Sequence, residues 1–381
     1  MGSACFTNCT SLTNIKLPSQ IKELPYGSCS WIDGDHYYTG GGYGFFSGCS
    51  SLTSIEIPDN VTELGEEAFS GCSKLESVML GSGLTSIGYR TFYNCSSLSS
   101  IVIPDNVTLL DASTFNGCLG LTSVIMGSGL ASIADKTFSG LSNLTSVTLG
   151  SGLTSIGSNA FYNCSSLSSI VIPDNVTELG DYAFAYCSNL ASATLGSGLT
   201  SIGYRAFYGC SSLSSIVIPD NVTSIGSGTF SGCSNLASAT LGSGLTTIGG
   251  SAFYGCSCLS SIVIPDNVTE LGSQAFAYCS NLASATLGSG LTSIGSNAFY
   301  YCSSLSSIVI PDNVTELGNQ AFYNCTELAS VICRPVVPPT LGSSVFSYNK
   351  SGRIISVPEA SVDAYKSSWS SYASSIQAMT E

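Results

Sequence analysis

The sequence predicts a solenoid, a right-handed, curved stack of short coils that contain β-strands, and three observations lead to this fold. Thirteen phenylalanines, from Phe46 to Phe322, follow one another at intervals of 23 residues without a slip. A cysteine stands three residues after nearly every one of them, and two kinds of turn recur along the chain. Repetition at such a period is typical of architectures in which each repeat buries its core only against its neighbours.

A single coil can be followed from Leu167 to Ser188. Ile170 and Ile172 stand two residues apart, so they point to one face of a strand. Pro173 ends this strand, because proline lacks an amide donor and the Asp and Asn after it favour a turn. Seven positions of the coil are predicted to lie in the core: Leu167, Ile170, Ile172, Val176, Leu179, Phe184 and Cys187.

A second version of the coil carries Gly-Ser-Gly in place of the proline turn, and the two versions mostly alternate. Proline turns lie at Pro58, Pro104, Pro173, Pro219, Pro265 and Pro311, and glycine turns begin at Gly81, Gly127, Gly150, Gly196, Gly242 and Gly288. The alternation slips once, between Gly127 and Gly150. The larger unit therefore contains two coils, which indicates duplication of coil pairs.

The N-terminal part of the chain departs from the repeat. An insertion at about residues 26–44 separates Phe6 from Phe46. The insertion contains four residues that we predict as a contact loop: Trp31, His36, Tyr37 and Tyr38. Catalysis there would depend on His36, the only histidine, and no partner residues stand at a fixed spacing from it.

The repeat region is expected to span residues 1–333, and residues 334–381 are expected to form a last partial repeat and a strand–helix cap. After a predicted strand at residues 353–357, apolar side chains recur at helical spacing: Val362, Tyr365, Trp369, Tyr372 and Ile376. Such a helix would cover the last coil, whose open end is otherwise an unpaired edge.

The unit L-x-x-I-x-I-P, followed by A-F-x-x-C-x-x-L, resembles the BspA-like leucine-rich repeat family, also called the Treponema pallidum type. One copy runs from Leu305 to Leu328, and the C-terminal segment from Ile355 to Ile376 looks like the end module of such proteins in Bacteroidetes. The resemblance implies a leucine-rich repeat solenoid that is surface-exposed or secreted, with adhesion to host proteins described for some members. It brings no catalytic residues, and the chain departs from it in the insertion and at Leu141, where cysteine is expected.

The charge composition argues against two classes of partner. The chain has 10 Lys and Arg against 24 Asp and Glu, a net charge of −14. Nucleic acids and anionic membranes need clustered basic residues, so neither is an expected partner. The sequence has no apolar run long enough to cross a membrane. We expect a secreted or outer-surface protein whose targeting segment has been removed from this chain.

The cysteines are predicted to form a reduced ladder inside the stack. Thirteen of the 17 occupy one slot, which Leu141 fills once, and buried free cysteine behaves as a small apolar residue. Disulfides between coils and metal binding are the alternatives. Stacked parallel side chains do not reach a disulfide dihedral, however, and a single row cannot surround an ion. The redox state of the others, which we expect nearer the surface, stays open: Cys5, Cys29, Cys258 and Cys333.

The outward positions of the strands form the predicted binding face. Serine precedes the first core residue of each strand, and Val or Thr mostly stands between the two core residues. These small, uncharged side chains permit close approach of an extended protein, although good strand formers on an ordinary surface are the alternative. The candidate residues are Ser100, Val102, Ser146, Thr148, Ser192, Thr194, Ser238, Thr240, Ser284 and Thr286.

Tyrosines directly after the repeat phenylalanine form a second candidate surface. Tyrosine is a common anchor in interfaces, and partial packing between coils is the alternative explanation. The members of this aromatic edge are Tyr162, Tyr208, Tyr254 and Tyr300. The recurring Asp-Asn pairs are interpreted as turn caps rather than calcium ligands, because calcium needs a converging set of six or more oxygens.

These features favour a non-enzymatic binding protein that needs no cofactor and holds no metal. Its partners are expected to be extracellular or host proteins, bound through the strand face. Two other functions are consistent with the sequence. One is a glycan-binding surface protein of a nutrient-uptake system that uses the aromatic edge, and the other is a passive structural spacer.

Overall fold

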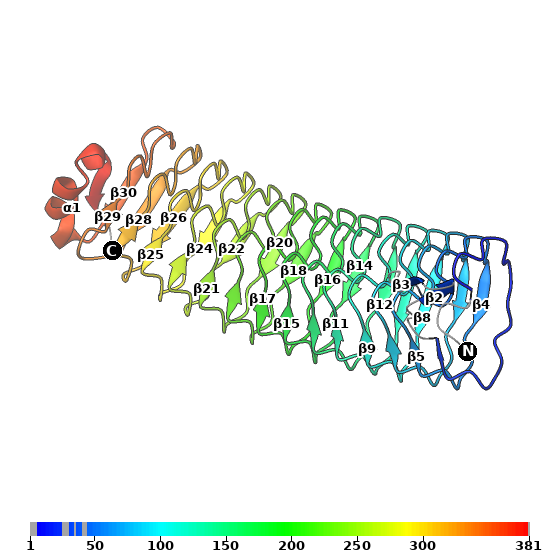
Figure 1. Cartoon of the computed structure of the whole chain (residues 1–381). Helices are drawn as coiled ribbons and strands as arrows, with labels where there is room; N and C mark the ends of the chain where they lie inside the picture. Colours follow the sequence, from blue (N-terminus) through cyan, green and yellow to red (C-terminus); the bar gives the residue numbers. More distant parts are fainter. Residues whose placement is uncertain (1–5, 25–29, 34–35, 40–43, 380–381) are drawn as a thin grey trace. The chain divides into compact units, whose positions relative to one another are not determined.

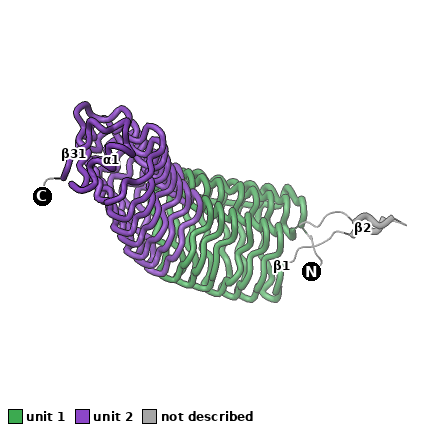
Figure 2. Tube along the Cα trace, turned by 90° about the vertical axis from the view of Figure 1, so that its left-hand side faces the viewer, with its two compact units in different colours: residues 1–190 green, residues 191–381 purple. Residues whose placement is uncertain are grey.

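The structure is a computed structural model that describes residues 6–24, 30–33, 36–39 and 44–379. The chain forms two compact units, Met1–Leu190 and Ala191–Glu381, each a stack of coils (Figure 2). Each coil contributes strands to parallel ladders with the coils before and after it, so both units have the predicted solenoid architecture. None of the described helices is long and apolar enough to span a membrane.

Unit 1 contains two rows of parallel strands. The first row consists of β4 (Ser54–Glu56), β6 (Ser77–Met79), β8 (Ser100–Ile103), β10 (Ser123–Met126), β12 (Ser146–Thr148) and β14 (Ser169–Val171). The second row consists of β1 (Glu23–Leu24), β5 (Glu63–Leu64), β7 (Ser86–Ile87), β9 (Leu109–Leu110), β11 (Ser132–Ile133), β13 (Ser155–Ile156) and β15 (Glu178–Leu179). Within each pairing, equivalent residues lie opposite each other, as Ser123 does with Ser146.

Unit 2 repeats this arrangement, and Figure 1 shows its two rows of arrows. The first row consists of β16 (Ser192–Thr194), β18 (Ser215–Val217), β20 (Ser238–Thr240), β22 (Ser261–Val263), β24 (Ser284–Thr286), β26 (Ser307–Ile310), β28 (Ser330–Cys333), β30 (Ile354–Val357) and β31 (Ile376–Ala378). The second row consists of β17 (Ser201–Ile202), β19 (Ser224–Ile225), β21 (Thr247–Ile248), β23 (Glu270–Leu271), β25 (Ser293–Ile294), β27 (Glu316–Leu317) and β29 (Thr340–Leu341).

Stacked phenylalanine rings run through the core of each unit. In unit 1, Phe161 and Phe184 have ring centroids 5.1 Å apart and planes 3° from parallel. In unit 2, Phe299 and Phe322 are 5.2 Å apart with the same interplanar angle. All seven predicted core positions of the coil from Leu167 to Cys187 are buried. The period of 23 residues therefore returns each ring to the place of the one before it, at about the spacing of paired strands.

The ladder cysteines have a hydrogen-bonding role besides packing. The Sγ–H of Cys256 donates to the carbonyl oxygen of Phe230 in the preceding coil at 3.2 Å, and Cys279 does the same to Phe253 at 3.2 Å. Each of these carbonyl oxygens also accepts the backbone N–H of the cysteine in its own coil, as Phe230 does from Cys233. The thiol thus fits its slot as a small apolar group with a weak donor, in the free state that the sequence predicts.

The alternation of the two turns has a structural reason. Asp220 of a proline turn accepts hydrogen bonds from the backbone N–H and the hydroxyl of Ser243, at 2.7 and 3.0 Å. Ser243 belongs to the next coil, where its carbonyl oxygen accepts a bond from Asn267 of the proline turn that follows, at 2.8 Å. A Gly-Ser-Gly turn that lies between two proline turns is therefore held on one side by an aspartate and on the other by an asparagine, as the turn-cap interpretation predicts. At the slip, within the described residues, Ser128 is held only by Asp105 and Ser151 only by Asn175.

The C-terminal cap contains η1 (Glu359–Ser361), α1 (Val362–Ser368) and η2 (Ser370–Ser375). The ring of Trp369 lies 6.0 Å from that of Phe346, the last phenylalanine of the row, and Tyr372 lies 5.6 Å from it. Trp369 Nε1 donates to the carbonyl oxygen of Pro339 at 2.9 Å, and the Tyr365 hydroxyl donates to that of Pro335 at 2.7 Å. The cap thus continues the aromatic core and closes the last coil.

The predicted helical face from Val362 to Ile376 is wrong in its second half. The helix α1 ends at Ser368, because Trp369 leaves the helical region with φ −104° and ψ 48°. Ile376 lies on β31, where it pairs with Ile355 of β30. Serine is frequent in this segment and supports a helix weakly, so strand pairing and the anchored tryptophan decide the local structure.

The insertion contains an antiparallel hairpin of β2 (Ser30–Asp33) and β3 (His36–Thr39). In its register Trp31 lies opposite Tyr38, and Ile32 lies opposite Tyr37. The predicted boundary between the repeat region and the cap, at residue 333, stays a prediction. The first row of strands extends past it, since β28 pairs with β30.

The close contact between neighbouring turns predicts that the second glycine of the Gly-Ser-Gly turn cannot be replaced. A Cβ on Gly244 would lie 2.1 Å from the carbonyl oxygen of Asp220. We expect Gly244→Ala to lower the free energy of unfolding by about 1–3 kcal/mol, as overpacking does. Thermal unfolding followed by circular dichroism measures this. Thr240→Ala, at an exposed side chain of the same coil, is the matched control, and an equal loss in both variants would contradict the prediction.

Candidate functional site

The ten candidate residues of the strand face are all exposed in the structure. They lie on β8 and β12 in unit 1 and on β16, β20 and β24 in unit 2, where the burial pattern alternates between solvent and core. Between the threonine-bearing strands, Val217 and Val263 expose more than half of their surface. In each unit the face therefore combines rows of hydroxyl groups with isolated apolar side chains.

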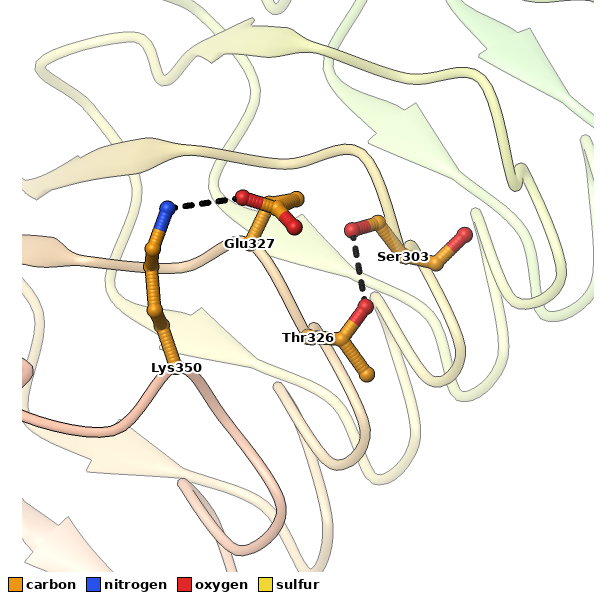
Figure 3. Close-up of polar contacts among 4 residues, drawn as sticks. All are labelled: Ser303, Thr326, Glu327 and Lys350. Atoms are coloured by element: carbon orange, nitrogen blue, oxygen red, sulfur yellow. Dashed lines mark hydrogen bonds and ion pairs between the residues drawn. The ribbon is translucent and has the colours of Figure 1, made fainter.

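Two sets of hydroxyl groups near the first row of strands differ in their hydrogen bonds. One set joins successive coils. Thr145 donates to the carbonyl oxygen of Thr122 at 3.0 Å, and Figure 3 shows Thr326 donating to that of Ser303, at 3.2 Å. The strand-face hydroxyls form the other set. For Ser146 and Thr148, as for the other candidates, no side-chain hydrogen bond is found within the described residues. The strand-face hydroxyls are thus available to solvent or to a partner.

A shallow groove follows the strand face beside the turns. In unit 2 it encloses about 770 Å³ between Ser238 and Thr240 of β20, Val263 of β22 and the turn residues Ser243 and Asp266. A similar groove of about 650 Å³ lies in unit 1, over β4 and β6. Such a groove can receive side chains of a bound segment, but it does not enclose a small molecule in the way a typical ligand pocket does.

The aspartates beside the groove are engaged by serine. Hydrogen bonds from the backbone and hydroxyl of Ser243 hold the pKa of Asp220 below its usual value, and Ser289 does the same for Asp266. Within the described residues, no three His, Cys, Asp or Glu side chains converge on a site that could hold a metal ion. The row therefore serves the turns, and its remaining carboxylate oxygens give the groove an acidic rim.

The four tyrosines of the predicted aromatic edge fall into three settings. Tyr162 contacts Tyr186 in unit 1, with ring centroids 5.4 Å apart. In unit 2, the guanidinium of Arg205 lies over the ring of Tyr208, at 4.9 Å. The other two, Tyr254 and Tyr300, join a larger cluster of rings in unit 2.

This cluster includes tyrosines that the candidate set left out. Its further members are Tyr278, Tyr301, Tyr323 and Tyr348. Three of them, Tyr278, Tyr301 and Tyr348, stand two residues after a repeat phenylalanine, where most other coils have Gly or Asn. The sequence pattern already marks Tyr278, Tyr301 and Tyr323 as tyrosines one or two residues after a repeat phenylalanine, and the same departure from the repeat could have found Tyr348.

The candidate residues of the insertion are described only as backbone. Trp31, His36, Tyr37 and Tyr38 lie on the hairpin of β2 and β3, where Asp33 is paired with His36. Their role as a contact loop stays a prediction.

The buried cysteines have no features of a reactive site. Burial raises the pKa of Cys72, Cys233 and Cys279 to about 12, so these thiols stay protonated. Cys333 is buried and contacts the Tyr365 hydroxyl at 3.3 Å, so the expectation that it lies near the surface is wrong. The reason is that the cap covers it. Cys258 is half-buried, and Cys5 and Cys29 lie outside the described residues.

Comparison with known proteins agrees with this architecture. A sequence profile described as BspA type leucine rich repeat region matches residues 1–31, 42–168, 110–237, 154–283 and 269–379. A solved leucine-rich repeat protein from Bacteroides ovatus is 26% identical, with a TM-score of 0.70, and the match covers 94% of this chain and 92% of that chain. A leucine rich cell surface protein from Faecalibacterium prausnitzii is 24% identical, with a TM-score of 0.43, over 95% of this chain and 92% of that chain. No curated protein matches this chain.

The aspartate–serine contacts predict a loss of stability in acid. The pKa values of Asp59, Asp220 and Asp266 are lowered in the folded protein, so the ionised form is favoured by folding. The stabilisation is complete above the ordinary value of 3.8 and is lost as the pH falls through the lower folded values. We expect the melting temperature to fall across this range.

A triple variant with Asn at these three positions is the control for the acid effect. Asparagine keeps the acceptor, as Asn319 does for Ser343 at 2.7 Å, but it does not titrate. The acid-induced drop in melting temperature should therefore be smaller in this variant. An unchanged drop would contradict the assignment.

The burial of the ladder thiols predicts that these cysteines resist alkylation in the folded protein. With iodoacetamide at about pH 8, the ladder peptides from Cys49 to Cys325 should stay unmodified until denaturant is added, because the reagent does not reach buried thiols. Peptide mass spectrometry measures this position by position. Rapid modification of Cys233 or Cys279 in the native protein would contradict it.

Proposed function

Because the chain belongs to the BspA-type leucine-rich repeat family, we propose that it is a non-enzymatic scaffold that binds proteins through its strand face. The observation that carries the proposal is the set of strand-face hydroxyls, which make no side-chain hydrogen bond within the described residues while the neighbouring hydroxyl column is used between coils. Repeat proteins commonly use such extended surfaces for binding.

The backbone of the strands supports recognition by side chains. Inner strands such as β18 and β24 pair with a neighbour on each side, so their amide and carbonyl groups are already used. A partner therefore does not add a strand there and instead contacts the outward Ser, Thr and Val side chains. Val217 and Val263 would contribute apolar burial, and the hydroxyls between them would donate and accept hydrogen bonds.

The partner that fits this face is an extended segment of an extracellular protein without a strong negative charge. The strand face in unit 2 is uncharged and the groove has an acidic rim at Asp220 and Asp266, which disfavours acidic segments. We further propose a secreted or cell-surface location and a role in adhesion, in line with the family resemblance. Limited proteolysis of intact producing cells, followed by detection of the chain, tests the location.

The strand face is tested by placing bulky charges in the groove of unit 2. The variant Ser238→Glu with Thr240→Lys keeps the net charge and fills the space beside β20 and β22. The probe is a panel of purified extracellular-matrix and plasma proteins, with binding measured by surface plasmon resonance. We expect any bound protein to lose about tenfold or more in affinity, because the close approach is blocked.

The matched control carries the same two charges on the second row of strands. Ser224→Glu with Thr247→Lys changes β19 and β21, which belong to a different sheet, and should leave binding unchanged. Two results would remove the strand face from the proposal. One is unchanged affinity in the β20 variant. The other is an equal loss of affinity in both variants when both are folded.

A further inference from the structure

Two backbone positions of the coil have a left-handed conformation in the described repeats. One lies two residues before the repeat phenylalanine and carries varied residues, among them Arg205 and Gln274. The other lies two residues after the repeat phenylalanine and has φ between 57° and 83°. Glycine adopts this conformation without strain, and asparagine tolerates it. The position is held by Gly48, Gly71, Gly117, Gly140, Gly209, Gly232 and Gly255 and by Asn8, Asn94, Asn163 and Asn324.

Tyrosine occupies this position four times, although the conformation is unfavourable for a bulky side chain. In unit 2, Tyr278, Tyr301 and Tyr348 have φ of 60°, 59° and 58°. Burial does not explain why tyrosine stands at these positions, because the three residues are 41%, 37% and 68% exposed. Strained positions of this kind are often retained for function rather than for stability.

The three tyrosines join three others in a continuous cluster. Tyr278 lies 5.2 Å from Tyr254, 5.5 Å from Tyr300 and 5.3 Å from Tyr301 between ring centroids. Tyr323 continues the cluster from Tyr300 at 5.2 Å to Tyr348 at 5.0 Å. Six rings from five successive coils therefore form one partly exposed aromatic surface within unit 2. Desolvation raises the pKa of Tyr254, Tyr300 and Tyr323, so their hydroxyls stay protonated.

A row of amide side chains stands beside the rings. Gln274, Asn297 and Gln320 each lie two residues before a repeat phenylalanine, and turn hydrogen bonds join Tyr300 to Asn297 and Tyr323 to Gln320 through the backbone, both at 3.0 Å. The side chains of Asn297 and Gln320 are half-buried and make no hydrogen bond within the described residues. Gln274 accepts one from Ser251 at 3.3 Å.

The six tyrosines and three amides of this surface carry no charge themselves. At one end, Arg205 lines the same groove as Tyr254 and Gln274, and its guanidinium lies over the ring of Tyr208 at 4.9 Å. Near Tyr348, Lys350 pairs with Glu327 at 2.8 Å (Figure 3). A basic peptide or an anionic polysaccharide would require opposite charges in the site. Neutral amides and phenols, by contrast, both donate and accept hydrogen bonds, which suits a ligand rich in hydroxyl groups.

We propose that the tyrosine–amide patch of unit 2, made of the six clustered tyrosines with Gln274, Asn297 and Gln320, binds a neutral oligosaccharide. The C–H faces of sugar rings pack on tyrosine, and their hydroxyl groups bond to the amides and phenols. Because rings follow one another over five coils, a linear chain of several sugars lying along the stack fits better than a single monosaccharide. This site is separate from the strand face and does not depend on the function proposed for it.

The test uses glycine, the residue that other coils carry at the strained position. The double variant Tyr278→Gly with Tyr301→Gly removes two exposed rings and should keep or raise the melting temperature. The matched control is Tyr186→Gly in unit 1, which changes the same position of another coil. Tyr278→Phe with Tyr301→Phe separates the rings from their hydroxyls.

The probes are neutral glucan, xylan, mannan and galactan oligosaccharides on an array, with heparin and hyaluronan as charged comparisons, followed by calorimetry of the best neutral binder. We expect the protein to bind a neutral oligosaccharide. The affinity should fall about tenfold or more in the double glycine variant and should be unchanged in Tyr186→Gly. Ser238→Glu with Thr240→Lys should bind the same glycan normally. Absence of neutral binding by the folded protein, preference for the charged glycans, or equal affinity of the double glycine variant would each overturn the proposal.

Discussion

Each coil of this protein is completed only by its neighbours, and the parallel pairing between them sets the geometry of everything else. Equivalent residues lie opposite each other, as Ser261 does with Ser284, so each column of the repeat becomes a straight row in space. The phenylalanine rings stack at about the distance that separates the strands, as between Phe253 and Phe276 at 5.2 Å. A core made of rows favours side chains of similar size along each row, as the row of cysteines with Leu141 shows, which keeps the repeats alike.

The same constraint separates structural rows from available ones. Backbone groups of the inner strands are used between coils, and so are the hydroxyls of the column that contains Thr145. The Asp-Asn turns are used in the same way, because Asp220 and Asn267 hold Ser243 from opposite sides. What remains for recognition is the outward side chains of the strands and, in unit 2, the edge where the tyrosines gather.

Most of the fold could be predicted because it is periodic. The seven core positions, the exposed strand face and the buried cysteine ladder all follow from the residue spacing, since a repeated row has the same environment in every coil. The prediction failed where the repeat ends. Trp369 terminates α1 through its contact with Pro339, and Cys333 is buried because Tyr365 of the cap lies against it. Neither contact has a counterpart in the repeats from which it could have been inferred.

The sequence by itself determined the solenoid, its period and the identity of its rows, because burial in a stack depends only on which residue returns to the same place. The tertiary structure alone decided which hydroxyls are bonded, which aspartates are engaged and which tyrosines meet. Tyr278 and Tyr300 stand at different positions of their coils, yet their rings are 5.5 Å apart. The backbone of Tyr278 is left-handed, a property that depends on the turn the coil must make and not on the preference of tyrosine.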